Sequence, residues 1–332
     1  MKKINRTLVL CLDMAGCPNR CKHCWLGELP SGKITEEEAR WAVTLFKPYF
    51  QDITFYSWLR EPDYLPGYKK RWEEDCALST IKPERFELAS FYRLVRDPKY
   101  VTFLKEVGVK KVQLTFFGGK ATTDSYVGRE GAYEELLQSS DLLQGNQIDP
   151  RWQIFINEEN KDEIEGLIAL GKKKGIKEIF VHEGSCDGNN RKLYDIRIEK
   201  DHIPEAVKPY YLDYDGVFPE AELVERLKDN EDHYLPHNEG DIVLYVTSDF
   251  NIYFNFTNPS PAWCIGNLKV DPINIIVKRA IAEEVPALEL ARGITIGALV
   301  RGYGNPKSKR VFSEDDFKMY VLNNYLDSKM AE

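Results

Sequence analysis

Three cysteines lie within eight residues near the start of the chain, and their spacing points to metal chemistry. Cys17, Cys21 and Cys24 stand in the stretch CPNRCKHC, a C-x3-C-x2-C pattern. A loop of this length turns three thiolates inward around one corner of an iron–sulfur cubane, whereas four-iron clusters normally take four cysteines. The triplet therefore predicts one [4Fe–4S] cluster with one iron left open to an outside ligand.

A zinc site is the alternative for the same loop. Zinc loops usually carry two C-x2-C knuckles, or one knuckle followed by paired histidines. A second knuckle is missing here, and the nearest candidate pair is His233 with His237. The remaining cysteines are scattered, so metal ligation by the triplet is favoured over disulfides.

The segments around the triplet alternate between strand and helix patterns. We expect strands at 7–13, 53–58, 109–118, 152–157 and 177–182, and helices at 35–50, 97–108, 131–143 and 161–175. Thr35 and Glu38 form a capping box at the first of these helices. Such alternation implies βαβ units and a parallel sheet. The expected fold is α/β, a partial (β/α)6 TIM-like barrel, whose reactive groups gather in loops after the strands. The cysteine loop has that position.

The pattern changes after about residue 205. A hairpin is expected over 243–256, with its turn near Asp249–Asn251, and helices follow from about 271. We therefore divide the chain into a core domain, 1–205, and a small α+β appendage, 206–332.

Composition limits the partners. Among the 332 residues the formal net charge is −8, which disfavours broad electrostatic binding to nucleic acid or an anionic membrane. The N-terminus has no signal-peptide pattern, and no apolar run approaches the roughly 18 residues of a membrane span. We expect a cytoplasmic protein without nucleic-acid or membrane partners.

The cysteine triplet after a first strand resembles the signature of the radical S-adenosylmethionine superfamily. The resemblance extends over about residues 7–200 and implies two cofactors, one [4Fe–4S] cluster and S-adenosylmethionine. The open iron would chelate the amino and carboxylate groups of S-adenosylmethionine. An electron, supplied by a donor such as flavodoxin or ferredoxin, would release a 5′-deoxyadenosyl radical that abstracts hydrogen from substrate. The protein would supply orientation and exclusion of water.

The same resemblance implies residues that bind S-adenosylmethionine. His23 precedes the third cysteine, where the family commonly has an aromatic residue. Glu61 with the following proline resembles the end of a Gly-Gly-Glu-Pro motif that holds an ammonium group, although both glycines are replaced. Thr115 is expected at the ribose, Arg129 at the carboxylate and Asn157 at the nucleoside. The structural alternatives are an exposed turn for Glu61, a threonine of a strand for Thr115 and a surface arginine for Arg129.

Residues 249–271 resemble a degenerate form of the SPASM extension found in peptide-modifying members. Gly266-Asn267-Leu268 fits its turn, but of the ligand cysteines only Cys264 is present, so we expect no auxiliary cluster. The appendage would cover the barrel mouth and shape substrate access.

Three residues at the end of the strand 177–182 or just beyond it are candidates at the substrate. Cys186 would donate a hydrogen atom, or is a structural thiol. His182 and Glu183 would face substrate, or make structural hydrogen bonds.

The favoured function is radical modification of a peptide in ribosomal natural-product maturation. The alternatives are a mutase, dehydrogenase or epimerase of a small metabolite, and a non-catalytic metal-binding protein.

Overall fold

A sheet built on the first strand forms one side of the molecule. The computed structural model describes residues 3–27, 32–236, 240–254 and 259–331. In it, β1 (Leu8–Leu12) pairs in parallel with β2 (Ile53–Tyr56) on one side and with β7 (Ile242–Val246) on the other. The antiparallel strands β8 (Asn251–Tyr253) and β9 (Cys264–Asn267) extend the β7 edge. The β7–β8 pair is the predicted hairpin, of which residues 255–256 lie outside the described residues.

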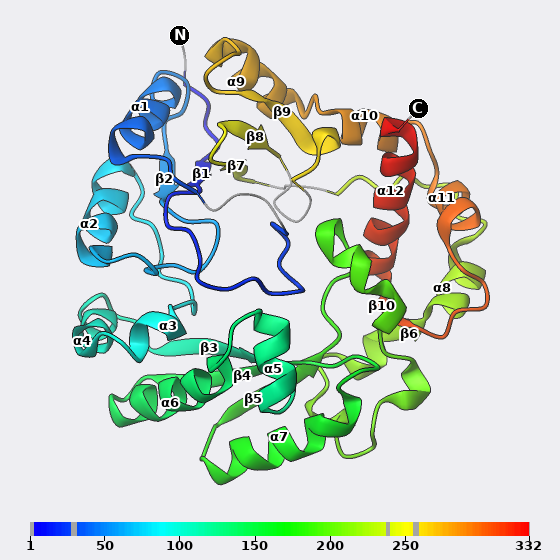
Figure 1. Cartoon of the computed structure of the whole chain (residues 1–332). Coiled ribbons are helices and arrows are strands. Elements are labelled where there is room, and N and C mark those ends of the chain that lie inside the picture. Colours follow the sequence, from blue (N-terminus) through cyan, green and yellow to red (C-terminus); the bar gives the residue numbers. More distant parts are fainter. Residues whose placement is uncertain (1–2, 28–31, 237–239, 255–258, 332) are drawn as a thin grey trace.

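A second parallel sheet forms the other side. It contains β3 (Lys111–Phe116), β4 (Asp149–Phe155) and β5 (Glu178–His182). Within the described ranges, no strand pairing joins β2 to β3 or β5 to β7. Figure 1 shows the two sheets facing each other across a ring, with helices on its outside. The predicted α/β fold and its partial, TIM-like barrel are therefore confirmed, and the sixth parallel strand is β7.

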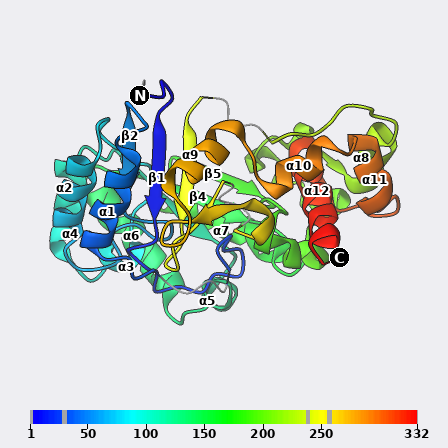
Figure 2. The ribbon, with the colours of Figure 1, turned by 90° about the horizontal axis from the view of Figure 1, so that it is seen from above.

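Helices surround both sheets, and Figure 2 shows α1 and α2 at one end of the molecule and α8 and α11 at the other. The helices of the first part are α1 (Glu36–Phe46), α2 (Tyr68–Leu78), α3 (Phe91–Leu94), α4 (Pro98–Glu106), α5 (Lys120–Val127), α6 (Ala132–Gly145) and α7 (Lys161–Lys173). Those of the second are α8 (Glu220–Leu227), α9 (Ile273–Ala282), α10 (Pro286–Arg292), α11 (Ile296–Tyr303) and α12 (Glu314–Met330). Short 3-10 helices are η1 (Gly188–Ile196), η2 (Lys200–His202), η3 (Lys208–Tyr210), η4 (Tyr214–Gly216) and η5 (Pro261–Trp263). A small antiparallel pair joins β6 (Val217–Pro219) to β10 (Val311–Ser313). Taken over the described residues, no helix has both the length and the apolar character needed to cross a bilayer.

Local sequence explains where the first helices begin. The Thr35 hydroxyl accepts a hydrogen bond from the main-chain N–H of Glu38, and the Glu38 carboxylate accepts one from the N–H of Thr35. This is the predicted capping box, which satisfies donors that a helix start leaves unpaired. The Asp97 carboxylate caps α4 by accepting a hydrogen bond from the N–H of Lys99, and Pro98 occupies the first turn, where its missing N–H costs nothing.

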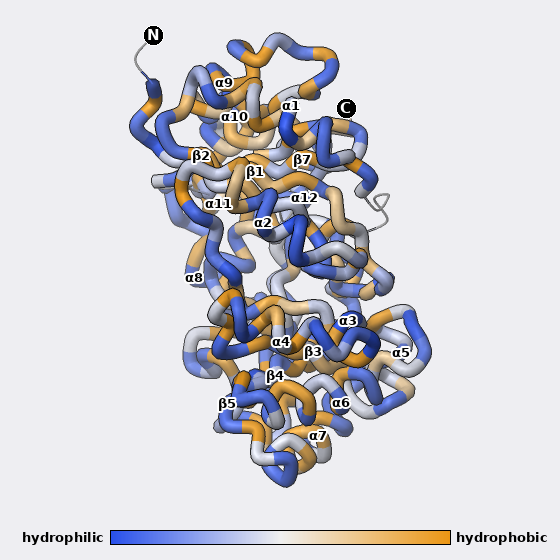
Figure 3. Tube along the Cα trace, turned by 90° about the vertical axis from the view of Figure 1, so that its left-hand side faces the viewer, coloured by the Kyte–Doolittle hydropathy of each residue, from blue (hydrophilic) through white to orange (hydrophobic). Residues whose placement is uncertain are grey.

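Two hydrophobic cores correspond to the two sheets. One packs β1, β2 and β7 against α1 and against helices α9 to α12, with Phe46, Trp263 and Phe317 fully buried. The other packs β3 to β5 around the buried Trp152. Figure 3 shows hydrophobic residues at β1 and β3, and helices in which hydrophobic and hydrophilic residues alternate. Because the first core contains residues from both sides of position 205, the two-part division of the chain stays a prediction.

Candidate functional site

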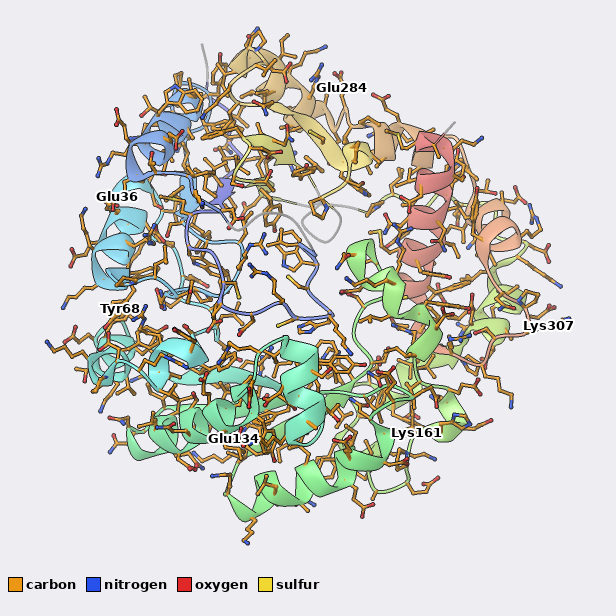
Figure 4. All side chains as sticks on the ribbon, viewed as in Figure 1. Glu36, Tyr68, Glu134, Lys161, Glu284 and Lys307 are labelled. Carbon is orange, nitrogen blue, oxygen red and sulfur yellow. The ribbon has the colours of Figure 1, made fainter. Side chains whose placement is uncertain are left out.

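The cysteine loop leaves the carboxyl end of β1 and crosses the inside of the ring (Figure 1). Two main-chain hydrogen bonds fasten it to α5, from the N–H of Arg20 to Val127 and from that of Lys22 to Tyr126, each 2.8 Å long. On the other side, the Asn189 amide donates to the carbonyl of Cys24 at 2.8 Å. In Figure 4 the labelled Glu36 and Glu134 lie on the outer helices, far from this loop. The loop is therefore held by α5 and η1 rather than by its own secondary structure.

A cavity of about 930 Å³ lies inside the ring and is lined by all three loop cysteines. Alternate residues of four strands point into it, as the two-residue period of a strand requires. These are Val9 and Cys11 on β1, Thr54 and Tyr56 on β2, Gln113 and Thr115 on β3, and Val243 and Tyr245 on β7. The volume is at the upper end of the roughly 300–1,000 Å³ typical of ligand pockets, so it has room for a nucleoside cofactor and part of a substrate.

The three thiols are unbonded to one another and partly buried. Burial raises the pKa of Cys17 to about 12, and the negative charge of Glu61 adds to the rise. Burial likewise raises the pKa of Cys21, with the neighbouring Cys17 and Cys24 adding to the effect. Thiols in such surroundings stay protonated until a cation compensates the thiolate charge, and a coordinating metal deprotonates them outright.

The geometry and chemistry of these donors fit a cluster. Within the part of the chain that the structure describes, no three His, Cys, Asp or Glu side chains converge closely enough to hold one ion. A cubane makes a different demand, because each cysteine binds its own iron atom. Three thiols around a wide cavity supply such separate ligands. Of the histidine pair weighed for zinc, His237 lies outside the described residues.

A polar bridge joins the cysteine loop to two of the predicted cofactor residues. The Asn19 amide donates to the Glu61 carboxylate at 3.0 Å, and its oxygen accepts from Nε of Arg129 at 2.9 Å. The Arg129 guanidinium also forms an ion pair with Glu135 at 2.7 Å. The fold thus brings Glu61 and Arg129 to the two ends of one buried asparagine, within the loop that carries the thiols.

Glu61 itself stands next to the first cysteine, with its carboxylate 3.8 Å from the Cys17 sulfur. Its other oxygen accepts a weak hydrogen bond from the N–H of Tyr92, at 3.4 Å. Burial raises the pKa of Glu61 to about 7, while its hydrogen bonds and the charge of Arg129 act in the opposite direction. A cationic group entering the cavity beside this carboxylate would stabilise its ionised form.

His23 lies in an aromatic stack rather than in water. Its ring centroid is 4.7 Å from that of Phe117 and 4.8 Å from that of Phe155, whose ring contacts His182 at 4.4 Å. Burial, with the nearby His182, lowers the pKa of His23 to about 4, so the ring is neutral at physiological pH. Its Nδ1 is buried and has no partner among the described residues. His23 lines the cavity with its neutral ring.

Thr115 and His182 belong to a polar ladder across the second sheet. The Thr115 hydroxyl donates to the Gln153 side chain at 3.0 Å, and the Gln153 amide meets Nε2 of His182 at 2.5 Å. Thr115 lines the large cavity, while burial and Arg197 lower the pKa of His182 to about 4. The ladder connects the cavity wall to the neutral imidazole.

Asn157, Glu183 and Cys186 line a second, much smaller cavity of about 30 Å³, which shares His23 and Phe117 with the large one. The Asn157 amide donates to Tyr126 at 2.6 Å, and its oxygen accepts from the N–H groups of Glu159 and Asn160 at the start of α7. Glu183 pairs with Arg197 at 3.4 Å. Cys186 is buried, and burial raises its pKa to about 12. Asn157, Glu183 and Cys186 therefore line the small cavity and not the large one, and His23 and Phe117 belong to the walls of both.

Sequence reasoning missed Asn19 and Gln153. Asn19 lies between the first two cysteines of the triplet. It belongs to no recognised motif there, so the sequence gives no sign that it bridges two other residues. Gln153 alternates with apolar residues along β4, a pattern that marks it as facing away from the core without naming its partners.

Comparisons with known proteins agree with this geometry. Residues 12–157 match the family model of the radical SAM superfamily, a range that includes the cysteine loop, Glu61 and Arg129. Two solved structures of anSMEcpe superpose on nearly the whole chain. The structure with bound AdoMet and the Cp18Cys peptide has a TM-score of 0.53 at 12% identity, covering 98% of this chain and 100% of that one. The structure with bound AdoMet alone has a TM-score of 0.52 at 13% identity, covering 98% of each chain. No curated protein sequence matches.

Fold and site together define an iron–sulfur enzyme with a partial barrel. The chain contains a radical SAM domain, matched over residues 12–157, and the cofactors of this domain are a [4Fe–4S] cluster and S-adenosylmethionine. Both fit the residues present, since three thiols and the Asn19 bridge border one cavity.

Proposed function

We propose that Cys17, Cys21 and Cys24 hold the cluster and that the enzyme abstracts hydrogen from a peptide substrate. The observation that carries this proposal is the meeting of the three thiols, Glu61 and Asn19 on one cavity. When bound, the cluster and S-adenosylmethionine supply the 5′-deoxyadenosyl radical. The residues of the chain bind and orient the cofactor and the substrate, and shield the reacting region from water.

The polar bridge orients S-adenosylmethionine in this proposal. Glu61 would accept a hydrogen bond from the amino group of the cofactor, and Arg129 would donate to its carboxylate, both bonds being of the stronger, charge-assisted kind. Asn19 fixes the distance between these two groups, because it bonds to each of them. An amino acid moiety, which carries its amino and carboxylate groups on one carbon, matches a carboxylate and a guanidinium held by one asparagine.

The aromatic stack shields the reacting region. The rings of His23, Phe117 and Phe155 pack against one another. The imidazole of His23 is neutral and buried in this stack, so it brings no charge and little water to the wall. Water exclusion strengthens every polar contact inside the cavity and protects a radical from side reactions. Thr115 offers its hydroxyl to the ribose from the same wall. The contact of Asn157 with the nucleoside, and those of His182 and Glu183 with substrate, stay predictions.

The size of the cavity supports a peptide substrate, because it exceeds what a nucleoside cofactor needs. The similar fold of anSMEcpe, solved with AdoMet and a peptide, is further support. A small-metabolite enzyme is the second candidate. Cys186 favours it, since its thiol lines the same small cavity as His23 and is a source of a hydrogen atom for a substrate radical. The appendage at 206–332 is proposed to shape substrate access, and flavodoxin or ferredoxin to supply the electron.

Anaerobic reconstitution tests the proposal. We expect about four irons per chain and formation of 5′-deoxyadenosine from S-adenosylmethionine with dithionite. Mass spectrometry of a candidate precursor peptide, encoded beside the gene, should then show a change in mass. Zinc without iron, or no 5′-deoxyadenosine from an iron-loaded protein, contradicts the proposal. A changed metabolite with an unchanged peptide favours the second candidate.

A further inference from the structure

The gap between the two sheets is covered by an irregular segment, residues 79–90, that connects α2 to α3. This segment forms part of the cavity wall. Its side chains Lys82, Glu84, Phe86 and Leu88 line the cavity at every second residue. The intervening residues are packed elsewhere, Pro83 being buried and Arg85 paired with the buried Asp63. One face of the segment is therefore turned toward the site.

Three of the side chains that this segment presents are large, apolar and exposed. Ile81 is 43% exposed, Phe86 49% and Leu88 39%. Several other large hydrophobic side chains are as exposed, but among the described residues these three are the ones that line the cavity. Contiguous apolar surface beside a binding site marks a place where a partner is bound, because its exposure to water is unfavourable.

Aromatic side chains from β2 continue this surface inward. The Phe86 ring lies 5.6 Å from that of Tyr56 and 6.2 Å from that of Trp58, and these two rings are 5.9 Å apart. Tyr56 and Trp58 also line the cavity. We call Trp58, Ile81, Phe86 and Leu88 the apolar rim. Its members line the same cavity as Glu61, and Lys82 and Glu84 line that cavity between them.

The segment is anchored, so the apolar rim is a preformed surface. The carbonyl of Glu87 accepts from the N–H of Gln113 on β3 at 2.7 Å, and the N–H of Glu84 donates to the Tyr56 hydroxyl at 3.2 Å. The Arg85 guanidinium lies over the Trp72 ring at 5.0 Å. These contacts fix the backbone and the neighbouring side chains of the segment. A preformed surface binds its ligand without paying for its own ordering.

We propose that the apolar rim is a specificity subsite, which binds an uncharged, apolar side chain of the peptide next to the residue that reacts. The inference rests on the proposed peptide-modifying function. The occupant follows from the chemistry of the rim, since burying a charged side chain against its aromatic and aliphatic groups is unfavourable, and the neighbouring Lys82 and Glu84 carry opposite charges that give the face no net charge. Continuity with the cysteine-lined cavity places the occupant beside the reacting group.

Equilibrium dialysis with the reconstituted holoenzyme tests this subsite. The probes are two radiolabelled, capped five-residue peptides of glycine and serine, with leucine at the centre of one and lysine at the centre of the other. We expect the leucine peptide to bind at least tenfold more tightly. The double variant Phe86→Ser, Leu88→Ser should lose this preference. Phe86→Leu should keep it, since the rim stays apolar. The matched control is Leu212→Ser, which removes a leucine that is 56% exposed but does not line the cavity.

The outcomes separate this inference from the proposed function. Equal affinity for the two peptides, binding of neither, or an unchanged preference in the double serine variant overturns the subsite. Loss of the preference in Leu212→Ser overturns it too, because the effect would then not belong to the rim. Formation of 5′-deoxyadenosine by the wild-type enzyme is measured without peptide. Its absence refutes the radical function and is independent of which peptide binds.

Discussion

Asn19 offers the sharpest test of how the site is organised, because one small side chain joins two charged groups. Asn19→Ala removes the donor to Glu61 and the acceptor for Arg129. Each group keeps another partner, the N–H of Tyr92 for Glu61 and the Glu135 carboxylate for Arg129. We therefore expect both side chains to remain folded into the site, but to lose their fixed separation.

The magnitude follows from the bonds removed. A hydrogen bond to a charged group contributes about 1.5–3 kcal/mol. If loss of the bridge costs the cofactor one such bond, binding of S-adenosylmethionine weakens about ten- to a hundredfold, since about 1.4 kcal/mol corresponds to a factor of ten. Asn19→Asp should be at least as damaging, because it sets a second carboxylate against Glu61.

The assay is equilibrium dialysis of S-adenosylmethionine with anaerobically reconstituted protein, with iron measured in the same samples. Asn146→Ala is the matched control, since the Asn146 side chain donates to the Leu142 carbonyl at the end of α6 and does not line the cavity. An affinity within threefold of wild type in an iron-loaded Asn19→Ala protein would refute the bridging role. Loss of iron in this variant would show instead that Asn19 supports the cysteine loop.

Three further predictions concern the cluster, a buried acid and a buried base. Replacing the three loop cysteines by alanine should remove all iron and all 5′-deoxyadenosine formation, while about eight irons in the wild type would contradict a single cluster. Burial raises the pKa of Asp75 to about 7, although a hydrogen bond from Ser57 acts in the opposite direction. The contribution of this carboxyl to the free energy of unfolding is therefore present at low pH and lost as the pH rises through 7. Asp75→Asn should thus raise the free energy of unfolding in urea at pH 8, by up to about 4 kcal/mol, and change it little at pH 4; equal effects at both pH values would count against this reasoning. Arg197→Met should lower the free energy of unfolding by about 3–5 kcal/mol, because it removes the ion-pair partner of the buried Asp316, and a loss below 1 kcal/mol in the same urea titration would contradict the ion pair.

Features that depend on neighbours in the chain were predictable from the sequence. The cysteine triplet needs only a short loop to bring its thiols together, and the capping box of Thr35 and Glu38 closes over three residues. The alternation of strands and helices along the first 205 residues predicted parallel sheets. This was possible because the two-residue period of a strand and the nearly four-residue period of a helix are local properties of the chain.

Contacts between distant segments were decided by the tertiary structure alone. β7 lies beside β1, although more than 200 residues separate them, and no local pattern states which strand fills that edge. Asn19 meets Arg129 across 110 positions. The exposure of Phe86 and Leu88 follows from the anchoring of their neighbours to β2 and β3, whereas a sequence rich in apolar residues would predict burial. The sequence by itself determined the chemistry of the ligands and the repeating elements. Packing decided which polar groups share the cavity and which apolar ones face its opening, because these depend on the meeting of segments that no short stretch encodes.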